Sequence, residues 1–196
     1  MSKIIILEGP DNTGKDTQQN LIIKNLYKAE GLAFQTVHFS SCPFETKEDN
    51  IEYSKRMYTD MFRCIHQCCE NDISVIYNRS HLGEAVYAPL YRNYDDDYVF
   101  DIEKEFKDCI FINQYNINKK VFDEIYLILF VGDKNVIFSR DDKLSFYKDA
   151  NGVQREREYF ERAFNKSIIP HKTLIDVTGK NIEEVNQLVM KFLCNN

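Results

Sequence analysis

Residues 3–17 read Lys-Ile-Ile-Ile-Leu-Glu-Gly-Pro-Asp-Asn-Thr-Gly-Lys-Asp-Thr, an apolar run followed directly by a glycine-containing loop. The run Ile4–Leu7 has no polar alternation, which is typical of a strand buried on both faces of a parallel sheet. The loop has the spacing G-x-x-x-x-G-K from Gly9 to Lys15. Because this spacing lets backbone N–H groups and a lysine surround phosphate oxygens, it predicts a site for the polyphosphate of a nucleotide.

Each part of this loop has an expected task. Gly9 leaves the strand in a tight turn, and Gly14 lets the backbone approach the phosphates. Lys15 reaches the outer phosphates, and the helix that begins near Gly14 directs its positive end toward the same place. The residues expected to bind the phosphates are Gly9, Asn12, Thr13, Gly14, Lys15, Asp16 and Thr17.

Asp16 is the irregular residue of the loop, since the usual pattern has Ser or Thr after the lysine. A carboxylate about 5 Å from a phosphate charge costs about 3 kcal/mol at an effective dielectric constant of 20. Either a Mg²⁺ ion therefore lies between them, or Asp16 turns away to a helix N-terminus or to a basic partner. Thr17 offers a hydroxyl, but one position out of register.

The size and charge of the chain narrow the classes of function. A chain of 196 residues with 43% hydrophobic residues is expected to form a single domain over 1–196. A net charge of −6 argues against a nucleic-acid or anionic-membrane binder, which needs a basic face. We expect no membrane span and no signal peptide, hence a cytoplasmic protein with reduced cysteines.

Further apolar runs alternate with helical stretches along the chain, and this alternation predicts an α/β fold with a central five-stranded parallel sheet flanked by helices. The expected strands are Lys3–Glu8, Phe34–Phe39, Ile73–Asn78, Glu124–Val131 and Thr173–Val177. The expected helices are Gly14–Glu30, Asn50–Glu70, His81–Tyr91, Asp101–Val121, Asn135–Asn165 with a break, and Ile182–Phe192.

Two polar stretches are expected to be mobile surface segments rather than parts of the sheet or of its packed helices. Tyr94–Tyr98 reads Tyr-Asp-Asp-Asp-Tyr and predicts a solvated acidic turn. Ser139–Arg157 is too polar for a core, and its Asn151-Gly152 pair predicts a break.

Four blocks of the chain resemble thymidylate kinases. Leu7–Gln18 is similar to the family opening F-E-G-x-D-x-x-G-K-S-T-Q, and Ile76–His81 is similar to its D-R-[YH] block after the third strand. Arg157–Arg162 resembles the E-x-x-F-x-x-R block behind the lid, and residues 174–185 resemble the last strand and helix. The Gly-Lys-Asp-Thr variant also resembles virus-encoded deoxynucleoside monophosphate kinases of broader specificity.

The resemblance implies a P-loop NTPase fold, a three-layer sandwich with a helical lid at about 139–157. It implies transfer of the γ-phosphoryl of ATP, with Mg²⁺ as cofactor, to the 5′-phosphate of a deoxynucleoside monophosphate. The expected acceptor is dTMP or a related pyrimidine nucleotide. Members of the family often form homodimers, so a homodimer is expected here too.

Residue roles follow from the matching positions. The resemblance assigns catalysis to Lys15, Arg79 and Arg140, and acceptor binding to Asp11, Tyr53, Arg56, Arg79 and Tyr87. Family members carry a catalytic arginine in the phosphate loop or in the lid. Asn12 and Thr13 stand in this loop, so the lid must supply it, with Arg140, Lys143 and Arg155 as candidates. Arg63 is the alternative to Arg56, because both lie on one face of the same expected helix.

The chain departs from the family at Asn78, where the D-R block has a carboxylate that helps to organise Mg²⁺. Compared with the family pattern, the chain thus lacks one carboxylate near the metal and has an additional one at Asp16. We interpret this as a swap in which Asp16 is the metal ligand.

Two other functions stay open. A deoxynucleoside kinase would need a carboxylate base after the second strand, where the first acid is Glu45. A non-catalytic nucleotide-binding regulatory module is the other alternative, although the strand contexts show no D-x-x-G switch motif.

Overall fold

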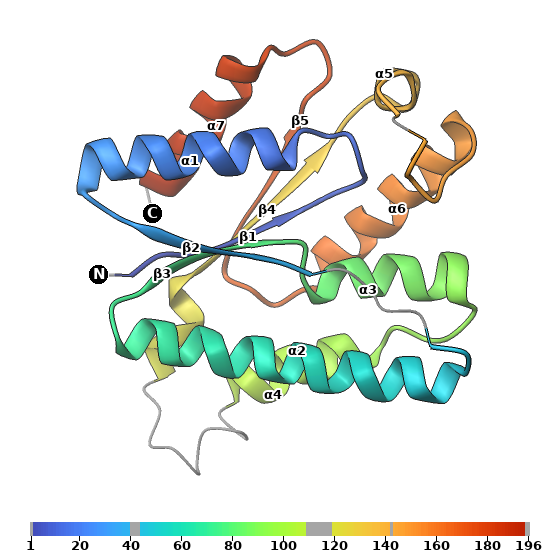
Figure 1. The fold of residues 1–196 in the computed structure, drawn as a ribbon, viewed down its shortest axis with the longest axis horizontal. Coiled ribbons are helices and arrows are strands. Elements are labelled where there is room, and N and C mark those ends of the chain that lie inside the picture. Colours follow the sequence, from blue (N-terminus) through green and yellow to red (C-terminus); the bar gives the residue numbers. More distant parts are fainter. Residues whose placement is uncertain (1, 40–43, 109–118, 142, 195–196) are drawn as a thin grey trace.

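Five parallel strands form the centre of the protein, as the sequence predicts (Figure 1). This computed structural model describes residues 2–39, 44–108, 119–141 and 143–194. The strands are β1 (Ile4–Glu8), β2 (Phe34–His38), β3 (Ser74–Asn78), β4 (Ile125–Val131) and β5 (His171–Asp176). Their order in the sheet is β2-β3-β1-β4-β5. The strand that precedes the phosphate loop is therefore the central one.

Helices connect the strands and cover both faces of the sheet. They are α1 (Lys15–Glu30), α2 (Lys47–Glu70), α3 (His81–Tyr87), α4 (Tyr98–Lys107), α5 (Lys134–Ser139), α6 (Ala150–Lys166) and α7 (Ile182–Cys194). A π-helical turn, Ala88–Arg92, continues α3, and a 3₁₀ turn, Lys119–Glu124, precedes β4. None of the described helices is long and apolar enough to cross a membrane.

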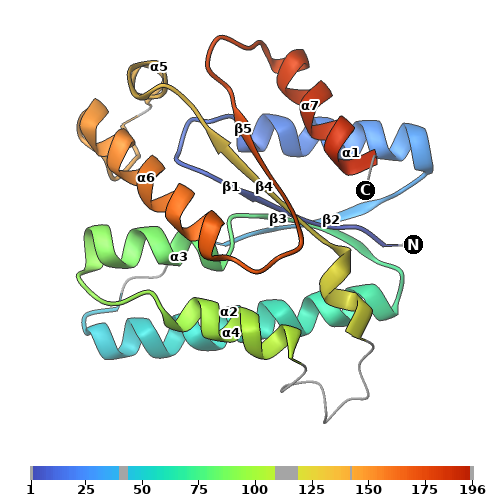
Figure 2. The ribbon, with the colours of Figure 1, turned by 180° about the vertical axis from the view of Figure 1, so that it is seen from behind.

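The alternating side chains of β1 supply two separate cores. Ile4 and Ile6 are fully buried on the face covered by α2, α3 and α4. Ile5 and Leu7 are fully buried on the other face, which α1 and α7 cover. The two views of the ribbon show this three-layer arrangement (Figures 1 and 2). Burial on both faces explains why β1 is apolar at every position from Ile4 to Leu7.

The prediction that 139–157 is too polar for a core is wrong in part. Tyr147 is 2% exposed and Val153 is 1% exposed, and both belong to the core beside α1 and α7. The break in the expected helix lies between Ser139 and Ala150, and Asn151-Gly152 instead forms the first turn of α6. Asp149 caps that helix, since its side chain accepts a hydrogen bond from the Gly152 N–H.

The acidic stretch at 94–98 is also less solvated than predicted. Asp96 is 8% exposed, and the Tyr94 and Tyr98 hydroxyls both donate hydrogen bonds to the buried Glu84 carboxylate. The expected helix Asp101–Val121 starts earlier, at Tyr98, and ends at Lys107. Its predicted continuation through 109–118 lies outside the described residues.

Candidate functional site

A cavity of about 870 Å³ lies at the carboxyl ends of the strands. Its walls come from the phosphate loop after β1, from His38 at the end of β2 and from Asn78 and Arg79 at the end of β3. The segment after α5 and the turn after β5 complete it. Parallel α/β sheets place ligand sites at this edge, because all strand ends point there. Of the predicted residues, those that line the cavity are Asp11, Asn12, Thr13, Gly14, Lys15, Asp16, Thr17, Arg79 and Arg140.

The phosphate loop starts where β1 passes very close to β4. A Cβ atom at Gly9 would lie 2.1 Å from the Phe130 carbonyl oxygen, and Gly9 has a φ of 138°, so only glycine fits. Gly9 does not line the cavity; it shapes the turn. α1 begins at Lys15, so the N-terminus of this helix points at the loop.

Lys15 is buried and folds back onto its own loop. Its Nζ donates hydrogen bonds to the carbonyl oxygens of Gly9 at 2.7 Å and Pro10 at 2.8 Å. Burial lowers the pKa of Lys15, and the Asp11 carboxylate opposes that shift. Because the acceptors of these two hydrogen bonds are neutral carbonyls, an anion placed in the cavity would stabilise the buried ammonium group further.

Arg79 and Asp11 join the turn after β3 to the phosphate loop. Arg79 Nη2 donates to Asp11 Oδ1 at 2.6 Å. Burial works against the charge of Arg79, but Asp11 outweighs it together with other anionic groups, and the pKa of Arg79 is raised. The backbone of Arg79 has a φ of 73°, a left-handed conformation that is rare for this residue type. Such strain is found where a side chain must point in one direction.

Glu8 holds this strained turn, and the sequence analysis missed its role. Its Oε1 accepts hydrogen bonds from the Ser80 N–H and the Ser80 hydroxyl, both at 2.6 Å, and from the Gly83 N–H at 3.3 Å. Glu8 is fully buried, and burial raises its pKa. The carboxylate thus connects the end of β1 to the start of α3, and it binds the residue that directly follows Arg79. An acid at the end of an otherwise apolar strand was the available signal.

Asp16 and Asn78 are direct neighbours. Asn78 Nδ2 donates to Asp16 Oδ1 at 2.5 Å. Asp16 is exposed on the first turn of α1, whereas Asn78 is 2% exposed at the end of β3. The buried Asn78 Oδ1 has no hydrogen-bond partner among the described residues. The two residues of the swap hypothesis, Asp16 and Asn78, are therefore in contact, and the role of Asp16 as a metal ligand stays a prediction.

The residues after α5 lie over the phosphate loop. Arg140, directly after α5, is exposed and lines the cavity, as Ser145 and Phe146 do. The side chain of Asn12 contacts this segment through Tyr147, with its Nδ2 2.9 Å from the Tyr147 hydroxyl. Lys143 and Arg155 are exposed and do not line the cavity. Arg140 is therefore the lid candidate that the structure brings to the site.

Tyr87 is buried beside the cavity rather than in its wall. Its ring centroid lies 5.9 Å from that of Tyr91 and 5.7 Å from that of Phe146, which does line the cavity. Tyr91 donates a hydrogen bond to Glu156 at 2.6 Å. Burial raises the pKa of Glu156 to about 7, and the Asp11 charge acts in the same direction. Nothing in the sequence distinguishes this buried carboxyl group from the other charged residues of α6.

Tyr53 and Arg56 lie on α2, outside the cavity. The Arg56 side chain is 76% exposed and pairs with Glu52 one turn away. Tyr53 packs its ring on Phe44, with centroids 5.1 Å apart. Arg63 pairs with Asp60 at 2.9 Å in the same way. The structure does not bring these α2 residues to the cavity, so their acceptor-binding role stays a prediction.

His38 is a cavity residue that the site prediction omitted. It is the last residue of β2 and is paired in register with Asn78. Burial lowers the pKa of His38, and the charge of Arg79 adds to this effect. The rule that ligands bind at the carboxyl ends of strands could have indicated it.

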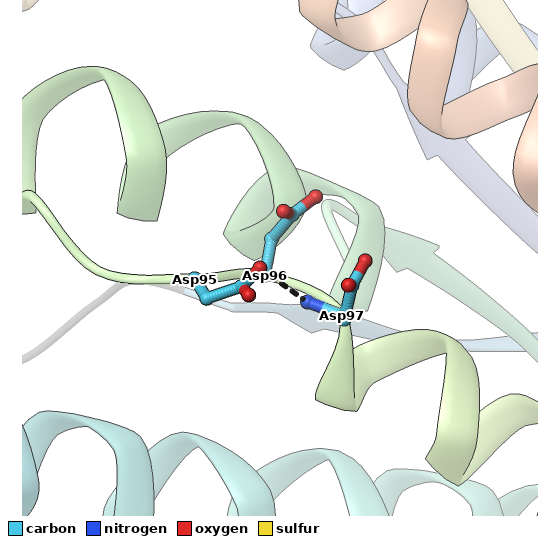
Figure 3. A group of neighbouring side chains, drawn as sticks. All are labelled: Asp95, Asp96 and Asp97. Atoms are coloured by element: carbon cyan, nitrogen blue, oxygen red, sulfur yellow. Dashed lines mark hydrogen bonds between the residues drawn. The ribbon is translucent and has the colours of Figure 1, made fainter.

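Three aspartates, Asp95–Asp97, lie next to one another before α4 (Figure 3). None of them lines the cavity. The Asp97 N–H donates to Asp95 Oδ1 at 3.2 Å. Arg162 pairs with Asp96 at 3.4 Å, and Lys166 pairs with Asp97. Because two of the three carboxylates already have cationic partners on α6, we assign this group to the ion pairs that join the turn before α4 to α6.

No family model matches the sequence, and a search of curated proteins finds no significant match. Solved structures do match. The thymidylate kinase of Candida albicans aligns with a TM-score of 0.60 at 13% identity, covering 100% of this chain and 92% of that chain. The thymidylate kinase of Ehrlichia chaffeensis aligns with a TM-score of 0.63 at 15% identity, covering 98% of each chain. At such identities the likeness shows the fold, and it confirms the predicted α/β fold with its five-stranded parallel sheet.

Proposed function

We propose that this protein transfers the γ-phosphoryl group of ATP to the phosphate of a deoxynucleoside monophosphate. One observation carries the proposal: a single cavity is lined by two anion-binding groups, Lys15 in the phosphate loop and Arg79 after β3, joined through Asp11. The first suits the donor polyphosphate, and the second suits an acceptor that itself carries a phosphate.

The acceptor is a phosphate rather than a hydroxyl for a physical reason. A hydroxyl acceptor is uncharged and must lose a proton, so its site depends on a general base rather than on a cation. A phosphate acceptor is already anionic and needs a cation that fixes its position. Arg79 meets this need, because its bond to Asp11 and its strained backbone hold the guanidinium group in one orientation.

Oxygen atoms suited to magnesium lie beside the phosphate loop. Mg²⁺ prefers oxygen ligands and keeps several waters. The exposed Asp16 carboxylate offers such oxygens, and so does Asn78 Oδ1, which has no hydrogen-bond partner in the part of the chain that the structure describes. We assign both groups to the ion or its waters. When bound, Mg²⁺ would neutralise part of the charge on the ATP phosphates.

The chain's own residues supply the remaining steps. Lys15 exchanges its carbonyl partners for phosphate oxygens, Arg79 orients the acceptor phosphate, and Arg140 adds positive charge from the lid side. Ser145 and Phe146 close the cavity on that side and limit the access of water, which competes as an acceptor.

The acceptor base is proposed to be thymine or a related pyrimidine. Two solved structures that share the fold, those of Candida albicans and Ehrlichia chaffeensis, are thymidylate kinases, which supports this choice. The buried Tyr87 beside Phe146 is proposed to pack against the acceptor sugar. A cytoplasmic homodimer is part of the same proposal.

An ADP-release assay over nucleosides and nucleoside monophosphates tests the function. We expect turnover with dTMP or another deoxynucleoside monophosphate, strictly dependent on Mg²⁺. Turnover with nucleosides alone would identify a deoxynucleoside kinase instead. ATP binding without any turnover would point to a regulatory module.

A further inference from the structure

The side chain of Asn12 is directed at the segment after α5. Its Nδ2 lies 2.9 Å from the Tyr147 hydroxyl, 3.3 Å from Ser145 Oγ and 3.5 Å from Asp141 Oδ1. A side-chain amide has two N–H donors. Tyr147 and Ser145 are therefore its main partners, and Asp141 stands at the limit of hydrogen bonding. All the hydrogen bonds that the Asn12 side-chain amide donates go to residues more than 120 positions away in the sequence.

The two main partners are fixed in place. Tyr147 is 2% exposed and Ser145 is 4% exposed. Tyr147 also packs tightly on the first turn of α6, where a Cβ on Gly152 would lie 2.7 Å from the Tyr147 Cβ. Glycine at that position therefore allows Tyr147 to lie between α6 and the phosphate loop. The contact therefore joins the phosphate loop to buried residues that precede α6.

The backbone of Asn12 suits the same task. Its φ is 64°, in the left-handed region, where asparagine is enriched several-fold over most non-glycine residues. Asparagine can adopt this backbone conformation and still offer two side-chain donors, which the contact with Tyr147 and Ser145 requires.

We propose that Asn12 is a positioning residue that fastens the lid segment, meaning the residues after α5 that include Arg140, Ser145 and Tyr147, to the phosphate loop. This contact sets the place of Arg140 in the cavity. Arg140 directly precedes Asp141, the third residue that Asn12 approaches, and it lines the same cavity. Positions 12 and 13 of the phosphate loop carry no arginine, so a cation near the transferred phosphoryl group on the lid side must come from across this contact. The proposal rests on the proposed function, which it extends by naming how the lid is held.

Two variants remove the contact with little effect on the fold. Asn12→Gly deletes the amide and tolerates the left-handed backbone, and Tyr147→Phe deletes only the hydroxyl group. Tyr27→Phe is the matched control, since Tyr27 is 63% exposed on α1. Trypsin reports on the lid without any need for catalysis, because Arg140, Lys143 and Lys148 are exposed there. Loss of hydrogen bonds of ordinary strength should speed cleavage at these sites by about 3- to 10-fold.

Measurement of kcat tests whether Asn12 acts by placing Arg140 in the cavity. We expect kcat to fall by about 3- to 10-fold in Asn12→Gly and by no more than that in Tyr147→Phe. The double variant should match Asn12→Gly, because Tyr147→Phe removes one of the hydrogen bonds that Asn12→Gly already removes. In an Arg140→Ala background, Asn12→Gly should no longer change kcat. Tyr27→Phe should match the wild type in both assays.

The outcomes separate this proposal from the proposed function. If tryptic cleavage is unchanged in both variants, the fastening contact is refuted, whatever the kinetics. If cleavage is faster but Asn12→Gly still lowers kcat in the Arg140→Ala background, Asn12 does not act by placing Arg140. If the wild type shows no turnover with any nucleotide, the proposed function fails and the role in catalysis fails with it. Cleavage then still decides whether Asn12 holds the lid segment.

Discussion

Replacing Asn78 by aspartate is the sharpest test of the pairing between Asp16 and Asn78. The substitution keeps the size of the side chain but replaces the donor amide with a carboxylate oxygen, facing Asp16 Oδ1 at 2.5 Å. The hydrogen bond is lost, which costs about 1 kcal/mol. The two carboxylates then repel each other.

The size of the repulsion follows from the surroundings of the pair. If the oxygens relax to about 4 Å, two unit charges repel by about 1 kcal/mol in bulk water and by about 4 kcal/mol at an effective dielectric constant of 20. Asp16 is exposed and Asn78 is buried, so an intermediate value applies. We expect Asn78→Asp to lower the free energy of unfolding by about 2 to 4 kcal/mol at neutral pH in EDTA.

Urea unfolding followed by circular dichroism measures this loss. The matched control is the double variant Asp16→Asn/Asn78→Asp, which reverses the pair and restores one donor and one acceptor. It should recover more than half of the loss. Millimolar Mg²⁺ should stabilise Asn78→Asp more than the wild type, because two carboxylates then face the ion.

Two results would refute the reasoning. If Asn78→Asp is as stable as the wild type in EDTA, the contact or its charge is not as described. If neither the reversed pair nor Mg²⁺ restores stability, the loss arises from packing at the end of β3 and not from repulsion.

Three further predictions concern single residues of the site. Lys15→Met should lower kcat by at least about 100-fold in the ADP-release assay without loss of stability in urea, because burial already disfavours the Lys15 charge. Arg79→Ala should raise KM for the deoxynucleoside monophosphate by about 10- to 100-fold and leave KM for ATP within about 2-fold; equal effects on both would contradict its assignment to the acceptor. Glu156 has a pKa of about 7 in the folded protein, above its ordinary 4.5, so the stability it contributes at low pH should be lost as the pH rises through about 7. The loss should reach at most about 3 kcal/mol, and a Glu156→Gln variant that shows the same urea midpoints from about pH 5 to about pH 8 as the wild type would disprove it.

Much of the framework could be read from local patterns. The unbroken apolar run at Ile4–Leu7 predicted the central strand, because a strand buried on both faces cannot alternate. The spacing of Gly9, Gly14 and Lys15 predicted the phosphate loop, since the loop geometry depends on neighbouring residues only. The order of strands and helices followed from the same local signals.

Errors arose where distant residues decide burial. The stretch 139–157 reads as polar, but Tyr147 is buried because α6 and the phosphate loop both pack on it. Asp96 lies in a run of acids and is nevertheless buried beside Arg162. Composition describes a segment on its own and cannot show which partner covers it.

The sequence by itself determined the fold class, the phosphate loop and the two irregular residues, Asp16 and Asn78, because each depends on a pattern within a few residues. Only the tertiary structure decided that these two side chains touch, that Asn12 binds the lid segment, and that Arg140 rather than Lys143 or Arg155 reaches the cavity. These facts depend on contacts between residues far apart in the chain. Such contacts form only when the parallel strands bring their carboxyl ends to one edge of the sheet.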